Sequence, residues 1–155
     1  MKYRQLTKEQ FESLHHEFAQ FLATQKIDKN EWKTIKENQP QVAEEELNLF
    51  SDLVWEEVLN KVLYLEHFSK NSINLFKTEK DQMHRIVVQV NKEVDLFAQN
   101  DYEWLLKNPN DESIEYLTGK KSYTTERNSE IFDLIEKGSQ ISKGELFEYF
   151  SRLTS

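Results

Sequence analysis

Cysteine is absent from this sequence, and glycine and proline are scarce. The 155 residues include three Gly and two Pro. Without cysteine the chain has no disulfide, no thiol nucleophile and no thiolate metal ligand. The shortage of helix-breaking residues, with 37% hydrophobic and 31% charged side chains, is typical of a folded, helix-rich protein. We therefore expect a single helical-rich domain over residues 1–155.

Long apolar runs and basic clusters are also missing. No window approaches the roughly 20 apolar residues of a membrane span, and the amino-terminal MKYRQLTKEQ lacks the apolar core of a secretory signal. We therefore expect a cytoplasmic protein that does not enter the membrane. The net charge is −8, and residues 37–68 carry one basic and eight acidic side chains. Phosphate backbones require clustered Lys and Arg, so nucleic acid is disfavoured as a partner.

The most apolar stretch is Pro40–Phe68, which predicts one long central helix. Its apolar residues recur at steps of three or four, and two flanking rows widen the apolar surface to about two-thirds of the circumference. The main row is Leu47, Phe50, Val54, Val58, Val62 and Leu65. A helix with so wide an apolar surface must be packed from several sides, so we expect the other elements to gather around it.

Two shorter helices are predicted before this stretch from their start signals. Thr7 followed by Gln10 is a capping box, and Asp28 followed by Glu31 repeats the pattern. The second helix should end before Pro40, because the residue preceding a proline avoids the helical region.

A change of period after Phe68 predicts a small antiparallel hairpin or meander within residues 73–96. Residues 73–77 form a short candidate strand, and residues 84–91 alternate apolar and polar side chains with a period of two. Val94 and Leu96 predict a third short strand.

Helix is predicted again in the last third of the chain. The expected helices are 101–107, 112–118 ending at Gly119, one from Thr124 or Thr125 to Gly138, and a last one opened by a capping box at Ser142 and Glu145. The predicted fold is thus mainly α (α+β), with helices around one long helix and a small β element.

Four residues suggest a metal site. Glu12 precedes His15 by three positions, and Asp81 precedes His84 by the same step. Bundle proteins hold two metal ions with such pairs from two helices. Here the second pair lies at a predicted turn and strand, and a complete ligand set is not evident. Surface histidines with charged neighbours are the favoured interpretation, and no metal or other cofactor is expected.

Two further groups of charged residues lie on the predicted central helix. Glu57 and Lys61 are spaced for an ion pair inside its apolar sector, which indicates either a partly buried pair beside a pocket or an ordinary surface pair. Glu45, Asp52 and Glu56 form an acidic face. This face is either solvated or a docking surface for a basic protein partner.

Motifs of common enzymes and of DNA-binding proteins are not found. Residues 118–122, TGKKS, end like a phosphate loop but lack its upstream glycine and Gly-rich turn. Residues 130–153 resemble the first two helices of a helix-turn-helix module without the recognition helix, so a helical hairpin is favoured. No catalytic residue is predicted.

The segments YRQLTKEQFESLHHEF and NLFSDLVWEEVLNKVLYLEHF resemble an uncharacterised bacterial family of small acidic proteins. The resemblance extends over nearly the whole chain and implies a free-standing domain, but no activity.

These observations favour a non-catalytic protein-interaction or adaptor protein. The alternative is a small metal-binding protein or enzyme that uses Glu12, His15, Asp81 and His84, or a pocket beside Glu57 and Lys61. The sequence leaves the partner and the oligomeric state open.

Overall fold

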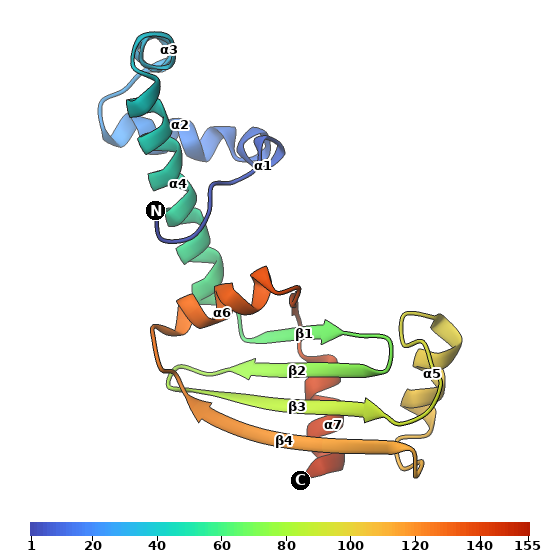
Figure 1. The fold of residues 1–155 in the computed structure, drawn as a ribbon. Helices are drawn as coiled ribbons and strands as arrows, with labels where there is room; N and C mark the ends of the chain where they lie inside the picture. Colours follow the sequence, from blue (N-terminus) through green and yellow to red (C-terminus); the bar gives the residue numbers. More distant parts are fainter. The chain divides into compact units, whose positions relative to one another are not determined.

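All residues from 1 to 155 are described by the structure, a computed structural model. They form two compact units, Met1–Asn60 and Lys61–Ser155 (Figure 1). Seven helices and one five-stranded antiparallel sheet make the fold α+β, as predicted. A single domain over the whole chain stays a prediction. None of the helices combines the length and the apolar character that a membrane span requires.

The first unit is helical, and three of its four helices begin where the sequence predicts; the first predicted helix is divided at Leu14 into two. The Thr7 side chain accepts the Gln10 N–H and the Gln10 side chain accepts the Thr7 N–H, so the capping box is confirmed. Asp28 caps the third helix through the Glu31 N–H. The helices are α1 (Lys8–Ser13), α2 (His15–Thr24), α3 (Lys29–Asn38) and α4 (Pro40–Lys61).

The core of the first unit is an aromatic cluster around Phe50 of α4. The rings of Phe11, Phe18 and Phe21 lie with their centroids 6.1, 5.0 and 5.5 Å from that of Phe50. Trp32 of α3 meets Phe18 edge-on at 5.3 Å. Offset and edge-on aromatic pairs add stability beyond the area they bury, so this cluster holds the four helices together.

The predicted rod is wrong beyond Lys61. α4 ends there, and residues 64–68 form a strand instead. Val54 is half-buried and Val58 is 39% exposed, whereas Trp55 and Leu59 are buried. Of the predicted main row, Phe50, Val62 and Leu65 are buried, but in the second half of α4 the flanking row is buried instead. A short apolar run is compatible with the period of a strand and with that of a helix. The apolar spacing therefore did not show that the helix ends at Lys61.

Carbonyl groups just beyond the end of α4 are bound by partners from distant segments. The Arg127 guanidinium donates to the carbonyl of Val62 and, at 3.1 Å, to that of Thr78. The Thr78 N–H donates to the Leu63 carbonyl at 2.6 Å. Helix ends leave carbonyl groups without intrahelical partners, and here the sheet unit supplies partners at the point where the chain turns into a strand.

The second unit is a sheet with strand order β4-β3-β2-β1-β5, all neighbours antiparallel. The strands are β1 (Tyr64–Phe68), β2 (Ser72–Thr78), β3 (Gln82–Val90), β4 (Ile114–Ser122) and β5 (Gln140–Ser142). The helices are α5 (Gln99–Lys107), α6 (Arg127–Glu136) and α7 (Glu145–Thr154). Figure 1 shows that α7 crosses one face of the sheet and that α5 lies at one end.

The two faces of the sheet differ because successive residues of a strand point to opposite sides. Ile73 and Leu75 of β2 face the same side as Ile86 and Val88 of β3, their register partners, and pack with Phe150 of α7. The opposite face carries Leu65, Phe76, Met83 and Thr78, which are buried on the side of α6.

Three predictions in this unit are wrong. Val94 and Leu96 lie in a loop, where both are buried in the core cluster, so their apolar character does not mark a strand. Residues 114–122 form β4, not a helix, and Gly119 lies within that strand. The cap of α7 is Gly144; Ser142 instead accepts the Gly144 N–H. In each case, a partner distant in sequence outweighs the local signal.

Replacing Arg127 with Ala is expected to destabilise the protein. The change removes hydrogen bonds to the Val62 and Thr78 carbonyls, and we expect a loss of about 2 kcal/mol of unfolding free energy. Arg127→Lys keeps the charge without the branched donor geometry and should lose an intermediate amount. Urea denaturation of the three proteins measures the difference, and equal midpoints would contradict this role.

Candidate functional site

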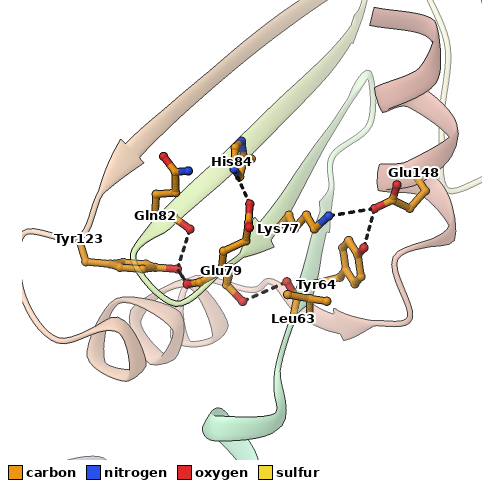
Figure 2. Close-up of polar contacts among 9 residues, drawn as sticks. Leu63, Tyr64, Lys77, Glu79, Gln82, His84, Tyr123 and Glu148 are labelled. Atoms are coloured by element: carbon orange, nitrogen blue, oxygen red, sulfur yellow. Dashed lines mark hydrogen bonds and ion pairs between the residues drawn. The ribbon is translucent and has the colours of Figure 1, made fainter. Parts of the chain in front are cut away.

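A row of polar side chains crosses one end of the sheet, on the face that carries α7. The strand register places Tyr64, Lys77, His84 and Lys120 next to one another on four successive strands. Figure 2 shows the first three with the carboxylates that reach them. An antiparallel sheet brings such residues together although they are far apart in sequence, so sequence patterns alone did not reveal this row.

Glu148 of α7 joins Tyr64 and Lys77. The Tyr64 hydroxyl donates to a Glu148 carboxylate oxygen at 2.5 Å, and the Lys77 ammonium lies 3.5 Å from the same oxygen (Figure 2). The hydrogen bond to Glu148 and burial raise the pKa of Tyr64. The same hydrogen bond, with the charge of Lys77, holds the pKa of Glu148 below its ordinary value. The ionised Glu148 carboxylate, held by Tyr64 and Lys77, therefore fixes α7 to the sheet.

His84 is paired with Glu79 in the turn between β2 and β3. The His84 Nε2 lies 2.6 Å from the Glu79 carboxylate, and the Tyr123 hydroxyl donates to the Glu79 carbonyl at 2.7 Å (Figure 2). Both strong acceptors of this region, Glu79 and Glu148, are thus engaged by neighbours in the same unit. Hydrogen bonds and ion pairs thus join Tyr64, Lys77 and His84 to these two carboxylates.

A groove, which we call the α6 groove, lies on the opposite face, between the sheet and α6. Its volume is about 510 Å³. Phe76 and Met83 form a buried apolar floor, and Leu134 of α6 adds to it. Charged side chains from β3, β4 and α6 form the rim: Arg85, Lys121, Glu130, Asp133 and Lys137. Gly119 and Lys120 also line the groove, but the register places the Lys120 side chain on the opposite face.

Cations outnumber carboxylates among the side chains of this rim, three to two. Lys121 and Glu130 form an ion pair at 2.6 Å, and the Glu130 side chain is only 11% exposed. Burial alone would raise the pKa of Glu130, but hydrogen bonds from Lys121 and from the Thr125 N–H outweigh it and lower the pKa. With Glu130 ionised and neutralised by Lys121, the rim keeps a net positive charge.

Arg85 lies against the floor of the α6 groove. Its Nε donates to the Asn74 side chain at 3.0 Å, and its guanidinium lies over the Phe76 ring with the centroid 5.8 Å away. These contacts hold the guanidinium against the sheet, while the side chain as a whole remains exposed. A guanidinium that is fixed in position and still exposed to solvent is suited to binding a carboxylate.

A second pocket, of about 270 Å³, brings two glutamates together. Glu66 of β1 and Glu145 of α7 line it with Tyr102 of α5. Burial and the nearby charge of Glu145 raise the pKa of Glu66, and burial with both glutamates raises that of Tyr102. Glu66 therefore holds a proton more tightly than an ordinary glutamate, but no third His, Asp or Glu joins the two glutamates to form a metal site.

The predicted acidic face of α4 is partly occupied by the chain itself. The two carboxylate oxygens of Asp52 accept the backbone N–H groups of Lys2 and Tyr3, at 2.7 and 2.9 Å. Glu56 accepts the Tyr3 hydroxyl and lies 3.4 Å from the Lys2 ammonium. Glu45 is exposed. The face thus binds an amino-terminal segment that carries a positive charge.

The other predicted site residues are not brought into one cluster. Glu57 and Lys61 are exposed residues of α4. Glu12 and His15 belong to the first unit, where His15 Nδ1 contacts the Glu12 carbonyl at 3.0 Å. Asp81 and His84 belong to the second unit. Nowhere do three or more His, Asp or Glu side chains come together in the arrangement that a metal ion needs.

The residues of the α6 groove escaped the sequence analysis for two reasons. Residues 112–118 were predicted to be a helix, so the side chains of β4 were not placed beside those of β3. Lys120 and Lys121 were considered only as part of a phosphate loop. The alternation of Ile114 and Tyr116, followed by Thr118, is a strand signal that could have located β4.

Gly144 should be required by the close approach of Tyr64. Its φ is +88°, and a Cβ built there would lie 2.4 Å from the Tyr64 ring. Gly144→Ala should therefore lose about 3 kcal/mol of unfolding free energy, from left-handed strain and from overpacking. The matched control is Gly119→Ala, where nothing lies within 4 Å of an added Cβ. Thermal denaturation that gives equal losses for both variants would contradict this reasoning.

The Tyr3 contact predicts a pH dependence. Burial, followed by the hydrogen bond and charge of Glu56, raises the pKa of Tyr3 to about 12. A raised pKa means that the contact stabilises the fold below pH 10.0, the ordinary pKa of tyrosine, and that this contribution disappears as the pH rises to about 12. Glu56→Gln should lower the pKa of Tyr3 toward its ordinary value. The tyrosinate absorbance, compared with that of Tyr3→Phe, measures it; an unchanged pKa would argue against the Glu56 contact.

The chain was compared with curated proteins, solved structures and protein families. No curated protein and no solved structure matches this chain. A protein family of unknown function, DUF6495, matches residues 1–155. The match covers both compact units and confirms the resemblance to an uncharacterised family. The chain is therefore a member of the family of unknown function DUF6495.

Proposed function

We propose that this protein is a non-catalytic interaction protein, an adaptor of the cytoplasm, and that the α6 groove is a binding site for a segment of another protein. The observation that carries the proposal is the composition of the groove. A buried apolar floor of Phe76 and Met83 is bordered by a rim with an excess of cations. This combination suits a polypeptide with acidic and apolar side chains.

The exposure of the rim favours a polypeptide over a small metabolite. Small-molecule sites enclose most of the ligand surface and converge on it with a few polar groups. Here Arg85, Lys121 and Lys137 are all exposed, so a ligand held by them keeps much of its surface in water. Glu130, the most buried ionised group of the rim, is already paired with Lys121 and is not available as a catalytic base.

The acidic face of α4 supports interaction with a second, basic partner. Asp52 and Glu56 already hold the backbone and side chains of Lys2 and Tyr3. These contacts show which chemistry the face accepts: N–H donors, an ammonium group and a phenol. A basic protein segment that docks on Glu45 and its neighbours would compete with residues 2 and 3 for the same carboxylates.

Capture of partners from native lysate tests the groove. We expect Lys137→Glu, which reverses a rim charge, to reduce recovery of a specifically captured protein by about tenfold. Lys107→Glu is the matched control, because both lysines are exposed and lie at the carboxyl end of a helix. Quantitative mass spectrometry of the captured proteins gives the readout.

Two outcomes would contradict the proposal. One is a captured set that is the same for both variants and the wild type. The other is a captured set lost equally from Lys137→Glu and Lys107→Glu, which would indicate non-specific charge attraction.

The same experiment with Glu45→Lys assigns any partner of the acidic face, because the charge of Glu45 can be reversed while Asp52 and Glu56 keep their contacts with Lys2 and Tyr3.

A further inference from the structure

β4 is an edge strand of the sheet. It pairs with β3 on one side and has no strand on its other side. It is nine residues long, and all residues from Leu117 to Ser122 are exposed. An edge strand presents unpaired N–H and C=O groups, which another extended chain can pair with. This free edge borders the α6 groove, since Gly119, Lys120 and Lys121 belong to both.

Gly119 leaves a gap between that edge and Arg85. The register pairs Gly119 with Arg85, so both residues face the groove. Nothing lies within 4 Å of the position that a Gly119 Cβ would occupy. A side chain on a strand added next to β4 would therefore pass over Gly119 toward the Arg85 guanidinium. Adjacent strands lie about 4.8 Å apart, so Arg85 would be two strands away and within reach of a glutamate side chain.

We propose that β4 receives an acidic, extended segment of a partner protein as an additional strand of the sheet. The inference rests on the proposed function of the α6 groove and adds the mode of binding. Backbone hydrogen bonds with β4 supply affinity, and carboxylates above Gly119 and beside Lys121 supply selectivity through the cations of the rim. This is strand addition to a free sheet edge, in which side chains at alternate positions are recognised.

Charge complementarity identifies the acidic character of the segment. Two residues of β4 at the edge are lysines, and Arg85 and Lys137 stand on the groove side. Lysines on an edge strand also discourage pairing with a second copy of the same edge, because like charges would face each other. A partner segment with glutamates at alternate positions relieves that repulsion.

The probe is a fluorescent octapeptide in which threonine alternates with glutamate. We expect it to bind the full-length protein and to raise fluorescence anisotropy, whereas a peptide with lysine in place of glutamate should not bind. Gly119→Val fills the gap toward Arg85 and should weaken binding by about tenfold. Thr118→Val is the matched control, since Thr118 lies one residue away on the opposite face; its effect should be less than about twofold.

Methylation of the peptide amides separates strand addition from simple charge attraction. Only every second residue of an added strand donates its N–H to the neighbouring strand. Of two peptides, one methylated at the threonine amides and one at the glutamate amides, we expect a single one to lose binding. Hydrogen exchange should also slow at β4 amides when the unmodified peptide binds.

Several outcomes would overturn the proposal. Equal binding of both methylated peptides, or equal effects of Gly119→Val and Thr118→Val, would exclude strand addition over Gly119. Displacement of the peptide by an equal concentration of single-stranded oligonucleotide would assign the rim to a general polyanion. Light scattering that shows a dimer dissociated by the peptide would assign the edge to a second copy. The two proposals can also be separated. If the Lys137→Glu variant no longer captures the partner protein while both methylated peptides still bind, the strand-addition proposal is wrong and the proposed function of the α6 groove is retained.

Discussion

The second unit depends on the pairing of Tyr64–Phe68 with strands on both of its sides. This short segment bonds to β2 along its whole length and to β5 at one end. Leu65 becomes fully buried on one face, while Tyr64 on the other face reaches Glu148. Since the segment follows α4 after only two residues, the chain must leave the helix abruptly. Arg127 and Thr78 donate hydrogen bonds to the carbonyl groups of Val62 and Leu63 at that point. These bonds satisfy backbone groups that the change from helix to strand would otherwise leave without partners.

Alternation along the strands then gives the sheet two different faces. One face is filled by α5 and α7 and carries the apolar core. The other is covered by α6 near Phe76 and Met83 and remains open around Gly119 and Leu117. A helix of ten residues, such as α6, is about 15 Å long, which is shorter than the nine-residue strands β3 and β4 beneath it. α6 is therefore too short to cover these strands along their whole length.

Both units carry more acidic than basic residues, but the rim of the α6 groove is locally positive. The overall charge is −8, and the acidic residues of α4 bind the amino-terminal segment through Asp52 and Glu56. The α6 groove has the opposite sign. Under the proposed function, these two surfaces of opposite charge would bind two different partners. The polar row at the end of the sheet has a structural role, because its carboxylates are engaged by Tyr64, Lys77 and His84.

Local patterns in the sequence determined the α+β class, the caps at Thr7 and Asp28, and the two central strands of the sheet. Each of these rests on interactions within a few residues, or on a period that a strand or helix imposes along itself. Tertiary structure alone decided the end of α4, the strand character of Ile114–Ser122 and the α6 groove. An apolar run such as Val62–Phe68 satisfies either period, and only its partners β2 and β5 select the strand. The groove joins Arg85, Gly119 and Lys137, which come from three elements, so no local signal could have placed them together.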